Sequence, residues 1–553
     1  MRYIESAVHF ILVLIVPAIL PVSVLFAQAP RLAWEKAAGG SLDDEARAVA
    51  ATPDGGCITA GFTNSTDGDI AALSPHGGYD YLVIKMNASG AVEWMKTYGG
   101  SATDKAAAII PTNDGGYIVA GTSNSNDGDV SKDNHFNANN NQPSNDFWLV
   151  KIDDAGTIQW AKSYGGGGDD EPTGIFQTPD NGYIVGGYTN STDGDISGNH
   201  GGYDYWVIRI DGAGNKLWSA CYGDKGNDQG FAMARMQDGD YVMTGLSRSN
   251  GGEVTGNHGA GDCWVIKIDT GGALKWEISL GGSSLDQGNG IFGTADNGCI
   301  VAASTESADG NLASVKMHGG VDGWIIKLDA TGAITWSNAY GGSQDDYAEA
   351  VIQQIDGSYI AAGQTASVNL PGVPLLGAID YWLFAIDGTG NVKWQDVYGG
   401  SNTDIAYALA PTSDTGWVLA GSTMSDDSEV TGAHLDNGSP TNDCWIMKAG
   451  GAQTHTAAVD EFASPTANVS VMIFPNPMEA NAIVTYNLTQ TGHVDVSIFN
   501  LLGEKTGTIV QNVETAGVHS VPLNVSAYKG GVYACRVESS AGVVWKLLNV
   551  MNR

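Results

Sequence analysis

Short runs that alternate apolar and polar residues recur along most of the chain, separated by turns rich in Gly, Asp and Asn. In one clear example the pattern predicts four strands, over 160–164, 174–177, 183–188 and 205–210. Short β-rich runs joined by such turns are typical of hairpins, and no comparable stretch keeps a helical period. The pattern therefore predicts an all-β protein.

The four-strand pattern repeats seven times. A segment related to W-x-K-x-Y-G-G begins every 58 to 66 residues, at Trp34, Trp94, Trp160, Trp218, Trp276, Trp336 and Trp394. A segment related to D-x-W-[VI]-I-K ends each unit, beginning at Asp80, Asp146, Asp204, Asp262, Asp322, Asp380 and Asp443. Seven such units predict a seven-bladed β-propeller, because radial repetition protects the edges of the sheets. A linear β-solenoid is the alternative, although its coils are usually shorter.

The two ends of the repeat array indicate how the ring closes. The array starts with a first strand at 32–37 and stops after a fourth strand at 445–448. Elsewhere the fourth and first strands of successive units form a hairpin, so we expect these terminal segments to pair and close the ring. Strand alternation also places the loops after the first and third strands on one face. Long loops on a rigid scaffold are where binding usually resides, which makes this loop face the candidate functional surface.

Three loops on this face depart from the repeat. Two carry insertions, at 132–145 and 433–442, and a third replaces an acidic loop by an apolar one with two prolines, at 368–379. The units that hold these loops are neighbours or near neighbours in a ring. A ligand site needs asymmetry, so we expect a site first in this sector. Neutral drift of the loops is the alternative.

The repeated string YGGSxxDxAxxIxxTxDGGYIVAGYTxSxDGD resembles the seven-bladed β-propeller repeat family of bacterial surface proteins. The resemblance covers residues 32–450. It implies the propeller fold and no single activity.

The D-G-D turns raise a calcium hypothesis. Each turn places two carboxylates close together, in the pairs Asp67 and Asp69, Asp127 and Asp129, and Asp193 and Asp195. Ca²⁺ takes several oxygen ligands, which clustered carboxylates supply, but the spacing does not match an EF-hand loop. The alternative is turn capping, in which Asp accepts hydrogen bonds from nearby amides.

A histidine recurs in the same loop, at His76, His135, His200, His258, His318 and His434. These histidines lie one per blade, so a zinc site would need separate blades to converge. We expect a structural role instead.

No motif nominates a catalytic residue. The Asp of G-G-S-x-x-D and the Asp of D-x-W each occur seven times, whereas a catalytic acid would be unique, so turn and cap roles are expected. The motifs G-x-S-x-G, H-E-x-x-H and C-x-x-C and a Walker loop are all missing from the sequence. Acids are so common that a paired-carboxylate glycosidase stays open, with no pair to nominate.

Residues 1–29 are typical of a signal peptide, with an apolar run at 10–26 and the small-x-small cleavage site Ala27-Gln28-Ala29. An uncleaved membrane anchor is the alternative. No later run reaches the roughly 18 apolar residues of a spanning helix, so no transmembrane span is expected in the mature chain. The six cysteines lie at equivalent or unmatched repeat positions, which favours isolated buried thiols over disulfides.

The repeat stops after Lys448, so we expect a propeller over 30–450, a linker over 451–468 and a separate β-rich module over 469–553. The module carries the ordered motif PNP…NLLG…GxH…GGVY…K, whose marker residues are Pro475, Asn476, Pro477, Gly503, Gly530, Gly531, Tyr533 and Lys546. It resembles the type A C-terminal sorting domain of the type IX secretion system of Bacteroidetes, with Asn500 in place of the usual Asp.

This second resemblance implies a small Ig-like β-sandwich of seven strands and contact with the secretion machinery and its sortase-like protease. It also implies delivery to the outer-membrane surface or the medium, after cleavage near the linker. An accessory β-sandwich that binds sugar or protein is the alternative from the residues alone.

The net charge of the chain limits the classes of partner that it can bind. The chain has 61 acidic and 26 basic residues and a net charge of −35, which excludes nucleic acid because its binding needs clusters of Lys and Arg. The leading hypothesis is an exported, non-catalytic binding or adhesion module for an extracellular glycan or protein. The alternatives are a polysaccharide-acting enzyme with its active site on one propeller face and a structural surface-layer component. An enzyme should show non-repeating acids at the central opening, and a binder exposed aromatic residues in the deviant loops.

Overall fold

The computed structural model describes residues 29–130, 144–436, 439–450, 462–463, 469–474, 481–488, 490–500, 505–524, 528, 531–539 and 542–550. They fall into two compact units, Met1–Ala452 and Gln453–Arg553. The β-strands of each unit pair with antiparallel neighbours.

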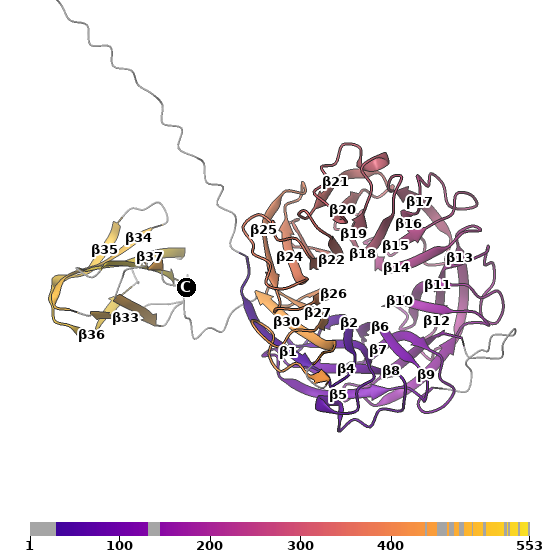
Figure 1. Ribbon diagram of the computed structural model, residues 1–553, viewed down its shortest axis with the longest axis horizontal. Helices are drawn as coiled ribbons and strands as arrows, with labels where there is room; N and C mark the ends of the chain where they lie inside the picture. The colour runs from indigo at the N-terminus through magenta and orange to yellow at the C-terminus, as the bar shows by residue number, and fades with distance from the viewer. Residues whose placement is uncertain are drawn as a thin grey trace, which may run out of the picture. The chain divides into compact units, whose positions relative to one another are not determined.

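Seven four-stranded sheets form the first unit, and we number them as blades in chain order (Figure 1). Blade 1 contains β2 (Asp44–Ala51), β3 (Cys57–Thr63), β4 (Asp80–Met86) and β5 (Val92–Tyr98). Blade 2 contains β6 (Asp104–Pro111), β7 (Tyr117–Ser123), β8 (Asp146–Ile152) and β9 (Ile158–Tyr164). Blade 3 contains β10 (Asp170–Gln177), β11 (Tyr183–Thr189), β12 (Asp204–Ile210) and β13 (Lys216–Tyr222). Blade 4 contains β14 (Asp228–Arg235), β15 (Tyr241–Ser247), β16 (Asp262–Ile268) and β17 (Leu274–Leu280).

The remaining blades follow the same order. Blade 5 contains β18 (Asp286–Gly293), β19 (Cys299–Thr305), β20 (Asp322–Leu328) and β21 (Ile334–Tyr340). Blade 6 contains β22 (Asp346–Gln353), β23 (Tyr359–Thr365), β24 (Asp380–Ile386) and β25 (Val392–Tyr398). Blade 7 contains β26 (Asp404–Pro411), β27 (Gly416–Thr423), β30 (Asp443–Gly450) and β1 (Leu32–Ala38). The loops add the 3₁₀ turns η1 (Gly68–Ile70) and η2 (Gly310–Leu312) and the short strands β28 (Leu435–Asp436) and β29 (Ser439–Pro440).

The two ends of the repeat array meet in blade 7, as the sequence predicts. Strand β1 pairs antiparallel with β30, with Trp34 opposite Lys448 and Ala38 opposite Cys444. On the other side, β2 of blade 1 contacts β26 and β27 of blade 7. The Tyr398 hydroxyl donates to the Pro30 carbonyl over 2.6 Å. At an ordinary junction the equivalent Tyr98 hydroxyl donates to the turn carbonyl of Gly156. The segment before β1 therefore takes the place of a turn at the junction of blades 6 and 7.

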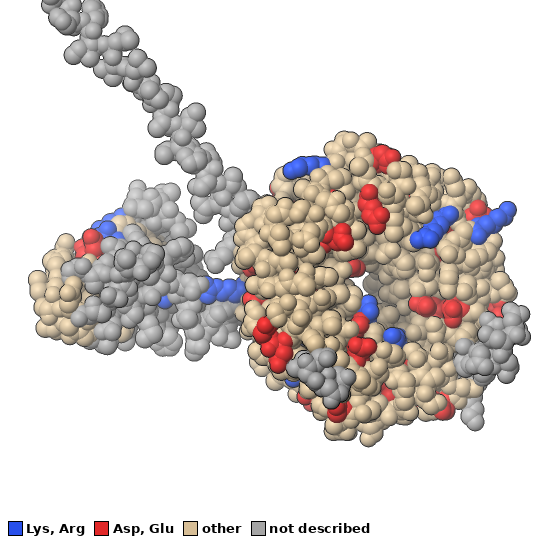
Figure 2. Space-filling view, viewed as in Figure 1, with Lys and Arg blue, Asp and Glu red and all other residues tan. Residues whose placement is uncertain are grey.

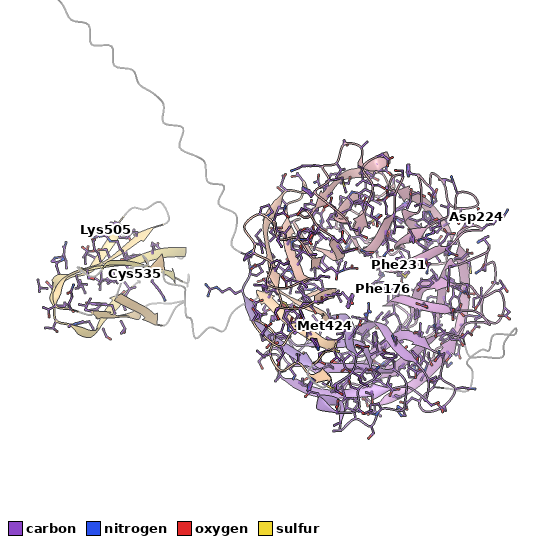
Figure 3. All side chains as sticks on the ribbon, in the orientation of Figure 1. Phe176, Asp224, Phe231, Met424, Lys505 and Cys535 are labelled. Carbon is purple, nitrogen blue, oxygen red and sulfur yellow. The ribbon has the colours of Figure 1, made fainter. Side chains whose placement is uncertain are left out.

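Buried strands at the middle of each sheet make the core. Their tryptophans after the repeated Asp are fully enclosed, and these are Trp148, Trp206, Trp264, Trp324, Trp382 and Trp445. The outer-strand tryptophans instead pack on the turn of the next blade, as Trp336 does by donating its indole N–H to the Gly388 carbonyl. The first strand of each blade lies nearest the central opening. Figure 2 shows this opening, and Figure 3 labels Phe176 and Phe231 on two of these first strands.

Neighbouring blades meet around a glycine held between two buried carboxylates. A Cβ atom placed on Gly99 would lie 2.1 Å from Asp80 Oδ1 and 2.8 Å from Asp104 Oδ2. The two aspartates come from adjacent blades, and both are fully buried. The same arrangement surrounds the equivalent glycines Gly39, Gly165, Gly223, Gly341 and Gly399, while the atoms nearest to Gly281 all belong to Asp286. We call it the Asp–Gly–Asp junction.

The second unit is a β-sandwich, as expected. One sheet contains β32 (Val469–Phe474), β33 (Asn481–Leu488) and β36 (Gly517–Asn524). The other contains β31 (Phe462–Ala463), β34 (Gly492–Asn500), β35 (Lys505–Glu514), β37 (Gly531–Ser539) and β38 (Gly542–Val550). Strand β31 lies within the predicted linker and pairs with β38, so this part of the linker adds an edge strand.

All six cysteines are buried and unpaired, which confirms the prediction of isolated thiols; Cys535 is labelled in Figure 3. In the part of the chain that the structure describes, no helix is long and apolar enough to cross a membrane. Residues 1–28 of the predicted signal peptide, Ala27 included, lie outside the described residues.

The Asp–Gly–Asp junction predicts a sharp difference between two Gly→Ala variants. Gly99→Ala should lower the free energy of unfolding by roughly 1–3 kcal/mol, because the new methyl group forces both carboxylates to move. Gly388→Ala is the matched control, since its nearest foreign atom lies 3.5 Å from the added Cβ. Urea unfolding followed by tryptophan fluorescence measures both. Equal stability of the two variants would contradict the packing described here.

Candidate functional site

A repeated hydrogen-bond network holds the loop face together. Asp104 Oδ2 accepts from the Gly100 N–H and from the Ser125 hydroxyl, each over 2.8 Å. The other six blades use the same G-G-S-x-x-D aspartate in the same way, and all seven are fully buried. Burial raises the pKa of Asp44 to about 6 and that of Asp170 to about 7, against hydrogen bonds that lower it. These repeated acids are structural, as the sequence indicates.

The repeated histidines bind the second aspartate at five of the seven junctions, and in blade 6 Asp380 accepts instead from the Leu376 N–H. Asp204 Oδ2 accepts from the His200 backbone N–H over 2.8 Å, and the ring Nδ1 lies 2.7 Å from the same oxygen. Burial raises the pKa of Asp204 to about 6. Similar contacts to the backbone N–H recur at His76, His258, His318 and His434, while His135 lies outside the described residues. The expected structural role is confirmed for the five histidines that the structure describes.

The aspartates proposed to bind calcium also accept hydrogen bonds from backbone amides. In each pair the first carboxylate crosses to the neighbouring loop: Asp67 accepts from Ser41, Asp127 from Ser101 and Asp193 from Gly167, all over 2.7 Å. The second carboxylate differs: Asp129 and Asp195 face the amides of Gly99 and Gly165, and Asp69 pairs with Lys36. Over the described residues, no group of three or more His, Cys, Asp or Glu side chains is placed to hold a metal ion. Calcium binding remains a prediction.

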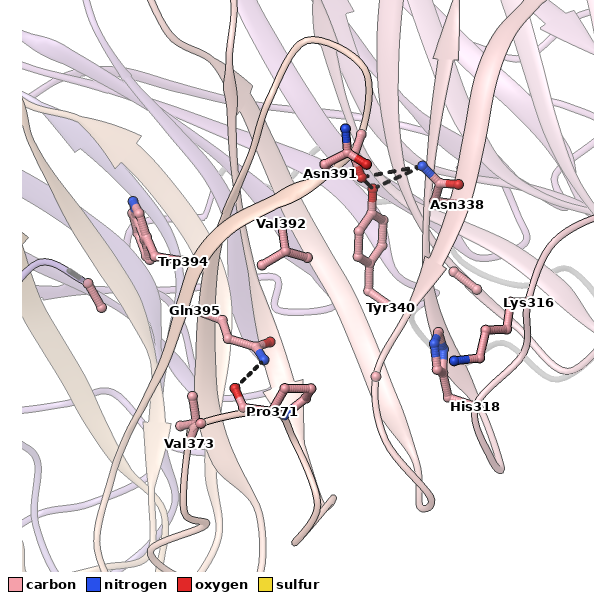
Figure 4. Close-up of a pocket in the computed structure, with 15 residues that line it drawn as sticks. Lys316, His318, Asn338, Tyr340, Pro371, Val373, Asn391, Val392, Trp394 and Gln395 are labelled. Carbon is pink, nitrogen blue, oxygen red and sulfur yellow. Dashed lines mark hydrogen bonds between the residues drawn. The ribbon is translucent and has the colours of Figure 1, made fainter. Parts of the chain in front are cut away.

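A cavity of about 550 Å³ opens between blades 5 and 6, and we call it the rim pocket (Figure 4). Its walls come from the outer strands β21 and β25 and from the apolar loop of blade 6, through Pro371 and Val373. The Gln395 side-chain amide donates to the Pro371 carbonyl over 3.1 Å and fixes this loop against β25. The pocket thus involves one of the three loops that depart from the repeat.

One substitution within the repeat removes a charge from the wall of the pocket. In blade 3 the loop carboxylate of Asp195 forms an ion pair of 2.5 Å with Lys216 on the outer strand. Aligning the repeats on D-G-D and on the outer-strand Trp places Pro371 and Val392 of blade 6 at these two positions. Both residues line the rim pocket. Pro371 therefore stands where most other blades have an acid, whereas Val392 is an ordinary residue of the repeat, because every blade except blade 3 has an apolar residue at that position.

The rim pocket also differs in charge from the rest of the protein. None of its fifteen lining residues is Asp or Glu, although the chain has 61 of them. Lys316 and His318, from the loop of blade 5, stand at one side (Figure 4). Asn338 donates to the Gly390 carbonyl over 3.3 Å, which leaves its side-chain oxygen as an acceptor at the wall. The sequence pattern missed these residues because they come from two blades.

The second unit carries the predicted sorting residues. Gly531 begins β37, and Tyr533 packs edge-on against Tyr528 with 5.2 Å between ring centroids. Lys546 lies opposite Cys535 in the sheet and is buried. Pro475, Asn476, Pro477, Gly503 and Gly530 lie outside the described residues.

Residues 472–550 match the protein family described as the secretion system C-terminal sorting domain. This segment is a sorting domain of that family. It places the protein among those exported by the type IX secretion system to the cell surface or the extracellular space. No curated protein matches the chain.

Several solved structures are distantly similar to the chain. A protein of unknown function from Bacteroides caccae has a TM-score of 0.30 and 13% identity, over 62% of this chain and 98% of its own. Sqt1 from Chaetomium thermophilum has a TM-score of 0.39 and 12% identity, over 76% and 100%. Puromycin hydrolase has a TM-score of 0.41 and 11% identity, over 82% and 60%. At these levels the likeness says nothing about activity.

The buried aspartates predict a stability that depends on pH. Burial raises the pKa of Asp44, Asp170 and Asp204 to about 6 to 7, whereas Asp in an unfolded chain has a pKa of about 3.9. Between these values the folded chain holds more protons than the unfolded chain. The free energy of unfolding should therefore fall as pH rises through that window. We expect the thermal midpoint of the propeller to be higher at pH 5 than at pH 8.

Acid should also destabilise the propeller at the other end of the range. Burial raises the pKa of Asp54, but the Lys85 ammonium outweighs this and lowers the pKa to about 2. The stabilisation that the Asp54–Lys85 pair gives is therefore lost below about pH 4.

Fluorescence melting follows the propeller, which holds 14 of the 15 tryptophans. Asp204→Asn keeps an acceptor for His200 and should reduce the difference between pH 5 and pH 8. A midpoint that is higher at pH 8 would refute the assignment of these aspartates.

Proposed function

We propose that the propeller is a non-catalytic module that binds an acidic glycan in the rim pocket after export. The observation that carries this proposal is the pocket itself, an apolar, acid-free cavity in a protein of net charge −35. Its volume of about 550 Å³ lies within the roughly 300–1,000 Å³ of typical ligand sites.

The lining supports a ligand with both apolar and anionic parts. Pro371, Val373 and Val392 offer an apolar surface to the C–H face of a sugar ring. Side-chain oxygens of Asn338 and Gln395 accept hydrogen bonds from hydroxyl groups. The ammonium group of Lys316 attracts a carboxylate or sulfate, which the acidic surface elsewhere repels.

The sorting domain supports the same setting. Export by the type IX system brings the propeller to the place where extracellular glycans occur. We propose that the secretion machinery recognises residues 469–553 and that the protease cleaves within the linker at 451–468. The propeller is then released or attached to the surface with its loop face free.

Binding to acidic oligosaccharides is expected to depend on Lys316. On a glycan array with uronic-acid, sulfated and neutral members, the mature protein should bind acidic members, and Lys316→Ala should weaken binding about tenfold. Lys225→Ala is the matched control, because Lys225 is an exposed lysine on a loop of the same face at another junction. Measurements with and without calcium test the calcium hypothesis in the same assay.

Two other results would replace this proposal. New reducing or unsaturated ends would indicate a polysaccharide-acting enzyme. No binding by the wild-type protein to any acidic glycan would leave a structural surface-layer component as the better reading. Pro371→Asp supplies a second check, since an acid at this exposed position in the wall should abolish binding, and the melting temperature reports whether the variant folds.

Removal of the sorting domain should stop export. A chain that ends at Gly450 is expected to remain inside the outer membrane, whereas the full chain reaches the surface or the medium. Immunoblots of cell fractions from a host with a type IX system measure this. Full-length Lys225→Ala serves as the control, because its substitution is exposed and its sorting domain is intact. Export of the shortened chain would contradict the role of residues 472–550.

A further inference from the structure

The first strands of the seven blades share a β-bulge at the central opening. In each strand the pairing register shifts at the fourth residue, as between Ala46 and Ala48 in β2. The bulged residues are Arg47, Ala107, Thr173, Phe231, Asn289, Glu349 and Tyr407. All seven are half-buried, and Figure 2 shows the opening that their strands surround. Bulges re-aim side chains and are enriched beside functional sites.

The bulged position is chemically diverse in a strand whose neighbouring positions are uniform. The residue before each bulge is Ala, Pro or Gly, and the residue after it is Ala or Gly. Small residues on both sides let the seven strands approach one another closely. The residue between them is a cation, an acid, an amide, a hydroxyl, a small side chain or an aromatic ring, depending on the blade. The seven bulged residues around the opening therefore have the asymmetry that the repeated scaffold lacks.

Three consecutive blades bring polar groups together on one side of the ring. The Arg47 guanidinium of blade 1 lies 3.9 Å from the centroid of the Tyr407 ring in blade 7. Its Nη2 atom pairs with Glu45 Oε2 over 2.5 Å. Glu349 of blade 6 comes next, and no described residue forms a hydrogen bond or ion pair with its carboxyl group. Phe231 of blade 4 is labelled beside the opening in Figure 3.

Other bulged residues are already engaged with the neighbouring strand. The Asn289 amide donates to the Ala348 carbonyl over 3.0 Å, and the Thr173 hydroxyl donates to the Gly230 carbonyl over 3.0 Å. These bonds fix the wall of the opening. Glu349 and the free N–H groups of Arg47 remain available to a ligand.

The charges of this group nearly cancel. Arg47 is neutralised by Glu45, and burial raises the pKa of Glu349 to about 7, with Arg47 opposing the shift. The charged or titratable groups near Glu349 are Arg47 and Glu45 of β2, Tyr407 of β26 and Tyr347 of its own strand. A neutral ligand is favoured over an anion, which Glu45 repels, or a cation, which Arg47 repels.

We propose that the central opening is a second binding site, which takes the uncharged, hydroxyl-bearing end of a saccharide chain. Glu349 and Arg47 bind adjacent hydroxyl groups, and Tyr407 contacts the C–H face of the ring. The opening is surrounded on all sides by strands, so only a chain end enters it. This site is separate from the rim pocket and holds whether or not acidic glycans bind there.

The test uses the full chain and a panel of neutral methyl glycosides and disaccharides of glucose, galactose, mannose and N-acetylglucosamine, measured by calorimetry. Binding should be about tenfold tighter at pH 6 than at pH 8, because the acid form of a group with pKa about 7 falls by about that factor. Glu349→Gln should bind equally at both pH values. Glu349→Ala and Arg47→Ala should each lose at least tenfold.

Two controls separate this site from the rim pocket and from misfolding. Lys316→Ala should leave binding of neutral saccharides unchanged, and Ala107→Ser alters the same ring in blade 2 and should also bind normally. The melting temperature of Glu349→Gln reports whether the variant folds. Failure of every neutral saccharide to bind the wild type, or equal binding by Glu349→Ala, overturns the proposal.

Discussion

The Asp–Gly–Asp junction is the interaction on which the rest of the propeller depends. Two carboxylates from neighbouring blades enclose one glycine, where a Cβ atom would lie within 3 Å of their oxygens. Bringing two acids together inside a protein costs free energy, and their raised pKa values express that cost. Backbone N–H groups and the Ser and Thr hydroxyls offset it by donating hydrogen bonds. The G-G-S-x-x-D and D-x-W sequences therefore recur together, because each supplies half of a junction.

This constraint decides where function can vary. The junction uses the loop aspartates, their glycines and most of the recurring histidines, so these positions are held by the fold. Variation is left to the loop tips, the outer strands and the bulged residues of the first strands. The rim pocket and the central opening lie at such positions: Pro371 replaces an acid of the loop, and Glu349 stands at a bulge.

Much of the fold was predictable from the sequence, while the sites were not. Strand order, the β1–β30 pairing and the buried cysteines follow from periodicity and repeat alignment, which are properties of one chain segment at a time. The rim pocket is lined by Lys316 of one blade and Val373 of the next. A pattern within one segment of the chain does not show that residues of two segments lie together. The bulges could not be predicted either, because a register shift changes the face of the sheet to which a side chain points without changing the sequence pattern. Loop 368–379 stood out in the sequence because, unlike the equivalent loops of the other repeats, it has no acid, and its residues line the rim pocket.

The seven blades also act as a substitution series for the calcium hypothesis. Five blades have the first Asp of D-G-D and blade 4 has Gly251, while blade 6 has Asn369, which still accepts from the Ser343 N–H over 2.8 Å. At the second position, blade 5 has Asn311, which accepts from the Gly281 N–H over 3.0 Å. A calcium site loses a charged ligand with each such change, whereas an acceptor for an amide needs only an oxygen at that place. The series therefore favours cross-linking of two loops as the property that these positions share.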